Sequence, residues 1–235
     1  MAKVLITLAD GFEDIEAVTA VDVLRRGGVE VVTASIHDRV EVKSAHGLTV
    51  RADALFADAA GGSYDAIVLP GGGEGTANLK RCEALLERLR RQKEEGRLLC
   101  AICAAPVVLV EAGVLGDGQH ITCYPTCIMD IDRPSADVPA VADGNVITGQ
   151  APGSALLFSL VVLQALAGER VASRVARGMV TAVLNSRILC WNGRRSLSGN
   201  FSGREEVFPS VPESISPNRC WWARLPGSSW WRSAT

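Results

Sequence analysis

The sequence predicts an α/β fold in which one doubly wound, mostly parallel sheet is sandwiched by helices. Apolar runs of strand length alternate with amphipathic helical segments along residues 1–185, the order typical of such sheets. The chain has 235 residues, of which 48% are hydrophobic and 21% charged, so a single domain can bury an ordinary core. In this fold class, ligands bind at the carboxyl ends of the strands.

The first quarter of the chain predicts a βαβ unit. Residues 3–8 are an apolar run, residues 12–26 repeat apolar side chains at helical spacing before a glycine pair, and residues 29–35 alternate as a strand. Such a unit winds right-handed. Two short runs, residues 40–42 and 48–51, predict a small hairpin.

The alternation continues to about residue 184. The further strands are predicted at residues 64–69, 98–102, 120–122 and 141–148, the last with a turn at Asp143-Gly144. The further helices are predicted at residues 76–95, from Pro106 onward, at 152–166 and at 169–184.

Cys103 lies where predicted strand 98–102 meets the helix that Pro106 begins. Small residues flank it, so the chain can bend sharply and push the side chain out of the sheet, as in a nucleophile elbow. A helix N-terminus favours a thiolate and can lower a cysteine pKa from about 8.5 to between roughly 3.5 and 7.5. Buried cysteines are usually inert, so packing and nucleophilic roles both stay open at this point.

Composition excludes several classes of protein. A net charge of −2 without a basic patch argues against a nucleic-acid partner. No apolar run is long enough to span a bilayer, and no signal-peptide pattern begins the chain, so we expect a cytoplasmic protein without a membrane partner. Seven cysteines, an odd number, indicate free thiols in a reducing compartment.

Residues 186–235 differ from the preceding domain. They hold all five tryptophans, many Ser, Pro and Arg residues, and little hydrophobic periodicity. A folded extension that docks by its tryptophans is one interpretation. A poorly ordered appendage and the product of a shifted reading frame are two others, and the missing periodicity favours these two.

Three separated segments carry a resemblance to a known family: GFEDIEAV at residues 11–18, VLPGGGEG at 68–75 and AICAAP at 101–106. Together they resemble the ThiJ/PfpI superfamily, in the branch that contains the Parkinson-disease-linked protein and its bacterial relatives. The resemblance runs from residue 3 to about 184 and omits the tail. It implies a flavodoxin-like homodimer without a cofactor, whose nucleophile is Cys103 at a strained elbow.

The resemblance also implies partners for the sulfur. Glu16 would reach Cys103 as a largely protonated carboxylic acid, a role consistent with the raised pKa of a carboxyl group beside a thiolate. Its alternative role is to complement the helix dipole. The backbone N–H groups of Gly72 and Ala104 would form an oxyanion hole. The glycines from Gly71 to Gly73 could instead make only a tight turn; a phosphate loop is a further alternative, but no Gly-Lys-Ser/Thr follows them.

Departures from the superfamily narrow the expected chemistry. Its protease-like members place a histidine directly after the nucleophile, where this chain has Ala104. Tyr124 stands where the Parkinson-linked protein has a histidine, so no histidine is evident as general base. His46 lies on a loop that in the family approaches the partner's pocket. Gly71, Tyr124 and His46 are thus candidate pocket residues, and His46 is also interpretable as a plain surface histidine.

The cysteine spacing has a metal alternative. Cys100 and Cys103 form C-x-x-C, and Cys123 and Cys127 form C-x-x-x-C. Cys100 lies inside a predicted strand, so its side chain should point away from the elbow. We therefore predict no metal site.

The function predicted first is a cofactor-independent glyoxalase or protein deglycase that acts on small reactive carbonyls, such as methylglyoxal, or on glycated side chains. A second hypothesis is an oxidative-stress sensor or redox-regulated chaperone in which Cys103 is oxidised reversibly. A peptidase or hydrolase of the PfpI type comes third. A protonated Glu16 beside Cys103 serves the first two mechanisms equally.

Overall fold

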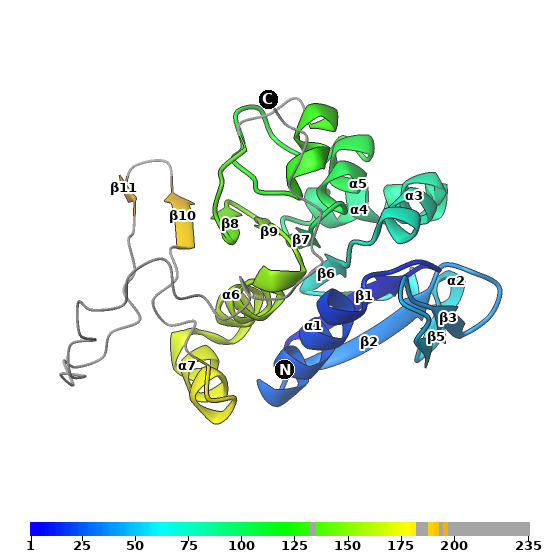
Figure 1. Ribbon diagram of the computed structural model, residues 1–235, viewed down its shortest axis with the longest axis horizontal. Helices are drawn as coiled ribbons and strands as arrows, with labels where there is room; N and C mark the ends of the chain where they lie inside the picture. Colours follow the sequence, from blue (N-terminus) through cyan, green and yellow to red (C-terminus); the bar gives the residue numbers. More distant parts are fainter. Residues whose placement is uncertain (132–134, 182–187, 193–194, 197–235) are drawn as a thin grey trace, which may run out of the picture. The chain divides into compact units, whose positions relative to one another are not determined.

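The computed structural model describes residues 1–131, 135–181, 188–192 and 195–196, with side chains up to residue 181. Within these residues one sheet has the strand order β11-β10-β8-β9-β7-β6-β1-β2-β5 (Figure 1). Its strands are β1 (Lys3–Leu8), β2 (Glu30–Ser35), β5 (Ala54–Leu55), β6 (Ala66–Leu69), β7 (Leu98–Ile102), β8 (Ala140–Asp143), β9 (Val146–Gly149), β10 (Ile188–Asn192) and β11 (Arg195–Ser196).

The sheet is mostly parallel, as predicted. Strand β1 pairs in parallel with β2 and β6, and β7 pairs in parallel with β6 and β9. The pairs β8–β9 and β10–β11 are antiparallel. The predicted hairpin forms a separate two-stranded sheet from β3 (Glu41–Lys43) and β4 (Thr49–Arg51).

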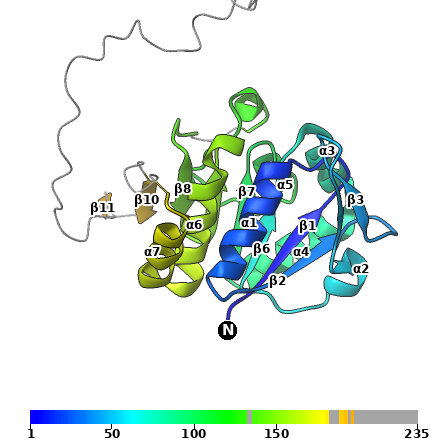
Figure 2. The same cartoon turned by 60° about the horizontal axis from the view of Figure 1, so that its bottom comes forward.

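Helices cover both faces of the sheet (Figure 2). One face carries α1 (Asp14–Arg26), α6 (Ala155–Ala167) and α7 (Glu169–Gly178). The opposite face carries α2 (Phe56–Ala59), α3 (Gly73–Arg81), α4 (Glu83–Glu94) and α5 (Pro106–Glu111). Two short 3₁₀ helices, η1 (Pro125–Asp130) and η2 (Pro152–Ser154), complete the described elements.

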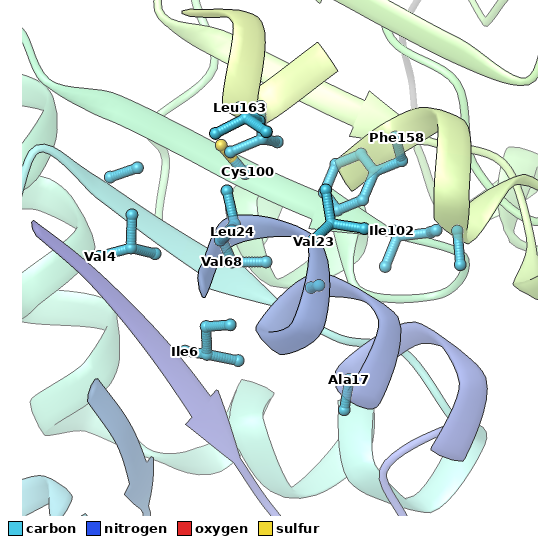
Figure 3. Packing of buried hydrophobic residues seen from close by; sticks show 14 of the residues in the cluster. Val4, Ile6, Ala17, Val23, Leu24, Val68, Cys100, Ile102, Phe158 and Leu163 are labelled. Carbon is cyan, nitrogen blue, oxygen red and sulfur yellow. The ribbon is translucent and has the colours of Figure 1, made fainter. Parts of the chain in front are cut away.

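Two hydrophobic clusters, one on each face, hold the layers together. In Figure 3, Val23 and Leu24 of α1 lie beside Phe158 and Leu163 of α6, and both helices pack on the same face of the sheet. Cys100 is fully buried in this cluster, and burial raises its pKa above the ordinary value. It is therefore a packing residue, consistent with the expectation that it points away from a reactive site.

Several predicted elements differ in detail from the structure. The helix predicted over residues 76–95 is two helices, because Cys82 between α3 and α4 adopts an extended backbone with φ −83° and ψ 91°. The strand predicted at residues 120–122 is only an isolated bridge between Ile121 and Ser135. The helix predicted over 169–184 ends at Gly178.

Strands β10 and β11 belong to the segment predicted as an atypical tail, and β10 pairs in parallel with β8. The predictions about residues 197–235 lie outside the described residues. Among the residues that the structure does describe, every helix is too short or too polar to cross a membrane.

Candidate active site

The three motif segments meet at the carboxyl ends of β1, β6 and β7. Backbone hydrogen bonds tie the first two segments together: the Glu13 N–H donates to the Gly71 carbonyl at 3.0 Å, and the Gly75 N–H donates to the Gly11 carbonyl at 3.1 Å. The third segment leaves β7, which lies beside β6 in the sheet. The edge formed by these strand ends is where ligands of doubly wound sheets bind.

Cys103 occupies a strained joint between β7 and α5. Its φ is +64°, a left-handed conformation that is uncommon for residues other than glycine and is frequent at functional sites. The backbone holds this conformation from two sides, because the Cys103 N–H donates to Gly149 at 2.9 Å and the Tyr124 N–H donates to the Cys103 carbonyl at 2.8 Å. The predicted elbow is confirmed, and it leaves Cys103 7% exposed.

Glu16 points from the first turn of α1 into the protein and is 1% exposed. Its Oε2 accepts a hydrogen bond from the Gly71 N–H at 2.7 Å. Its Oε1 is buried and has no hydrogen-bond partner among the described residues. Glu13, whose Oε2 accepts from the Glu16 N–H at 2.8 Å, caps the helix instead. The helix N-terminus is therefore capped by Glu13 and not by Glu16.

Glu16 and Cys103 shift each other's pKa. Burial raises the pKa of Glu16 to about 7, although the Gly71 N–H and the Cys103 thiol oppose this rise. Burial, the charge of Glu16 and the hydrogen bond to it raise the pKa of Cys103 to about 12. The N–H groups of Ala104 and Gly72 lower it, but by less. The raised pKa of Glu16 agrees with the prediction from sequence.

The expectation that the pKa of Cys103 is lowered is wrong. The expected cause was the dipole of the following helix, but α5 is only six residues long and begins at Pro106, beyond the turn that holds Cys103. A dipole acts mainly within one turn of the helix end. Burial and a neighbouring carboxylate, which both disfavour a second negative charge, therefore exceed it.

A thiolate is still accessible through the pair as a unit. The two groups interact directly, so they titrate as a coupled pair in which one proton can reside on either the carboxyl or the sulfur. When the carboxyl of Glu16 holds this proton, Cys103 is a thiolate beside a neutral acid. The N–H groups of Gly72 and Ala104 favour this arrangement because they point at the sulfur.

Neighbouring atoms come so close to Gly71 and Gly72 that these positions have no room for a larger side chain. A Cβ on Gly71 would lie 2.8 Å from both the Cys103 Cβ and the Glu16 Oε2. Gly72 has φ +92°, and a Cβ there would lie 2.2 Å from the Gly11 carbonyl oxygen. The glycine turn thus brings Gly71 to Glu16 and Gly72 to Cys103. The family resemblance implied the second of these contacts, and the first was not predicted.

The two other candidate pocket residues, His46 and Tyr124, differ in exposure and in their contacts with the site. The His46 side chain is 71% exposed, and its Nδ1 lies 2.8 Å from Asp14 Oδ2, a contact that raises the pKa of His46. Potential ligand atoms of Glu13, Asp14 and His46 lie within 4.8 Å of one another, so this group could hold a metal ion. Tyr124 is half-exposed and is joined to Cys103 through its backbone.

A groove beside the Cys103 turn was not predicted from sequence. It has a volume of about 490 Å³ and begins at Gly73 and Ala104. Lys80 of α3 and Glu111 of α5 line it and form an ion pair at 3.0 Å, and Cys127 of η1 lines it as well. No sequence signal marks this groove, because its walls come from three elements separated along the chain.

Comparison with known proteins places the chain in a family. The family model described as DJ-1/PfpI family matches residues 2–165. Protein DJ-1 homolog B of Arabidopsis thaliana is 37% identical over 180 residues, which are 76% of this chain and 41% of that protein. The chain thus spans less than half the length of this relative.

Two further comparisons cover nearly whole proteins. The glutathione-independent glyoxalase DJR-1.2 of Caenorhabditis elegans is 31% identical over 173 residues, 72% of this chain and 91% of that protein. The solved structure of Toxoplasma gondii DJ-1, oxidized, has a TM-score of 0.74 and 33% identity, and the match covers 77% of this chain and all of that one. This chain belongs to the DJ-1/PfpI family.

Proposed function

We propose that this protein is a cofactor-independent glyoxalase that converts methylglyoxal to lactate, and that it acts as a deglycase on glycated side chains. The observation that carries the proposal is the buried Glu16 carboxyl beside Cys103, with its pKa raised to about 7. An acid with this pKa can both donate and accept a proton near neutral pH. The glyoxalase name of the Caenorhabditis elegans relative supports the same reaction.

The proposed reaction begins when the Cys103 thiolate adds to the aldehyde carbon. A C–S bond forms, the C=O π electrons move to oxygen, and Glu16 delivers its proton to that oxygen. The resulting hemithioacetal then rearranges: Glu16, now a carboxylate, removes the hydrogen from the former aldehyde carbon as a proton, and the released electrons form a C=C bond as the ketone C=O electrons move to oxygen. That oxygen takes up the proton of the hydroxyl group on the former aldehyde carbon, whose C=O bond forms as the proton from Glu16 is returned to the neighbouring carbon. The product is a lactate thioester on Cys103. Water hydrolyses it to lactate and restores the thiol.

The N–H groups of Gly72 and Ala104 would stabilise the oxygen that becomes negative when the thiolate adds. Their direction toward the sulfur supports this role, since the oxyanion forms one carbon away from the sulfur. Gly71 holds the carboxyl of Glu16 in place through its N–H. Tyr124, which is half-exposed and bonded through its backbone to Cys103, and His46, which is exposed, would contact the substrate.

Lactate formation tests the proposal. Methylglyoxal is added without glutathione, and lactate is measured for the wild type, Cys103→Ser and Cys82→Ser. We expect Cys103→Ser to lose at least about 10³-fold in rate because a serine hydroxyl does not ionise near neutral pH. Cys82 lies outside the site and serves as the control. Lactate production by Cys103→Ser at the wild-type rate would refute the glyoxalase proposal.

The site also supports a second candidate function, an oxidation sensor. In the acid–thiolate form, peroxide transfers one oxygen to Cys103, giving a sulfenic acid and hydroxide. A second peroxide gives a sulfinate that Glu16 and the two N–H groups would stabilise. The related Toxoplasma gondii structure is described as oxidized.

Mild peroxide followed by peptide mass analysis tests this function. We expect added oxygen at Cys103 before Cys82 or Cys127, although both are more exposed than Cys103, because the proton-sharing pair supplies a thiolate. Oxidation of either exposed thiol first would contradict the sensor function and would leave the lactate test unaffected.

We further propose that the protein acts as a homodimer. Ile15 and Val18, three residues apart on α1, are 55% and 49% exposed, so one face of this helix presents apolar side chains to solvent. We expect light scattering to give a mass of twice 24.9 kDa. Ile15→Lys should reduce it to that of one chain, whereas Ile128→Lys on η1 should leave the dimer intact. A monomeric wild type would contradict the proposal.

A further inference from the structure

A second groove lies on α4 and the turn that follows α2. Its volume is about 580 Å³. Its lining residues are Ala60, Gly61, Ala84, Glu87, Arg88, Arg90, Arg91 and Glu94. None of these residues belongs to the segments that converge on Cys103, so this groove is separate from the candidate active site.

Arg88 is the unusual residue of this groove. It is 3% exposed, and its Nη2 donates to the Gly62 carbonyl at 3.3 Å. Its Nε and Nη1 are buried and have no hydrogen-bond partner in the described part of the chain. The guanidinium carbon lies 5.9 Å from the centre of the Tyr64 ring. The ring contact stabilises the charge but leaves two donors unsatisfied, which is unfavourable in a buried group.

The charge of Arg88 is only partly compensated: the carboxylate of Glu95 raises its pKa, but burial and the charge of Arg91 exceed this effect. Within the described residues it forms no ion pair, and burial followed by the charge of Arg91 lowers its pKa. Arg91 lies on the same groove and donates from Nη2 to the Ala60 carbonyl at 2.9 Å. Three arginines, Arg88, Arg90 and Arg91, therefore line one groove, and among the described residues Arg88 is the one of them without an ion pair.

The turn beside these arginines leaves space for a ligand. A Cβ on Gly61 would meet no atom within 4 Å, so the groove is open at this residue. Glu87 and Glu94 also line it. Their negative charges oppose the binding of any anion, and most strongly that of an extended polyanion such as a nucleic acid, which carries several charges past them.

We propose that this groove binds an oxyanion, the phosphate or carboxylate group of a small molecule, on Arg88 with the assistance of Arg91. A guanidinium matches either group geometrically, because its parallel N–H donors can bond two oxygen atoms at once. The ligand would supply acceptors for Nε and Nη1 and the missing counterion together. Binding requires a small displacement of the groove lining, since both donors are shielded from solvent.

Calorimetric titration at constant ionic strength tests the site with two probes, inorganic phosphate and acetate. We expect the wild type to bind at least one of them at a single site, and the probe that binds identifies the group as phosphate or carboxylate. At ten times its Kd, that probe should raise the Tm by roughly 3–6 °C.

Arg88→Met and Arg88→Lys separate the site from general salt effects. Methionine removes the charge and should abolish binding, and lysine, which lacks the paired donors, should weaken it about 10-fold. Arg90→Met is the matched control, because Arg90 lines the same groove but its Nε and Nη1 are bonded to Ala112 and Glu83. Failure of the wild type to bind either probe, or equal binding by Arg88→Met, would overturn the proposal.

Discussion

Replacing Glu16 by glutamine is expected to reduce kcat for lactate formation by about 10²- to 10⁴-fold, because the amide can neither give nor take the proton that the rearrangement moves. The same substitution should stabilise the folded protein at pH 8 by about 3 kcal/mol. The two effects have opposite signs because the carboxyl that the proposed reaction uses is buried, and burying its charged form destabilises the folded protein. A residue with a purely structural role would lose stability and activity together.

The sign of the stability change follows from the pKa of Glu16. An unperturbed glutamate carboxyl has a pKa of 4.5, and in the folded protein this value is about 7. Between these values the folded state binds more protons than the unfolded state, so stability falls as pH rises. The contribution of Glu16 is complete below pH 4.5 and is lost by about pH 7. Glutamine does not titrate and shows no such loss.

Urea unfolding at pH 4.5 and at pH 8 measures this difference. We expect the wild type and Glu16→Gln to approach each other at pH 4.5, and the variant to be more stable at pH 8. Glu41→Gln, which removes only the exposed ion pair with Arg51, is the control and should change stability by less than about 1 kcal/mol. A Glu16→Gln variant that is less stable than the wild type at pH 8 would contradict the raised pKa.

The central strands could be predicted because buried parallel strands are continuous apolar runs. Strands β1 and β7 have the predicted bounds, since no residue within either run competes with the strand conformation. The break between α3 and α4 at Cys82 is not marked by any pattern in the sequence. Its neighbours keep helical spacing, yet α3 ends at Arg81 and α4 begins at Glu83, so the break depends on the folded chain and not on a local breaker residue.

The sequence indicated which residues form the candidate site, but it did not indicate the direction in which the pKa of Cys103 is shifted. The strand–turn–helix pattern indicated Cys103, the family resemblance implied Glu16 and Gly72 beside it, and the structure brings these residues together. The pKa of Cys103 depends on burial and on a carboxylate from a helix 87 positions earlier in the chain, neither of which a local pattern records. The pairing of His46 with Asp14 escaped prediction for the same reason, since a β-hairpin turn meets the start of α1 only in the folded chain.

The second large effect that we expect is from Gly72→Ala, which should destabilise the protein by about 3 kcal/mol or more. Gly72 has φ +92°, where an alanine is strained, and the added Cβ would lie 2.2 Å from the Gly11 carbonyl oxygen. That oxygen is backbone and accepts a hydrogen bond from Gly75, so it cannot move without opening the junction between the motif segments. The Gly72 N–H would leave the sulfur of Cys103, and lactate formation should fall as well.

Gly73→Ala is the matched control, one residue along the chain. A Cβ on Gly73 would meet no atom within 4 Å, and Gly73 is the first residue of α3, so alanine should stabilise the protein by up to about 1 kcal/mol. Urea unfolding of both variants measures the difference. Equal stability of the two would mean that the 2.2 Å approach relaxes freely. The turn would then not require glycine at position 72. The geometry that holds Glu16 against Cys103 would have to depend on other residues.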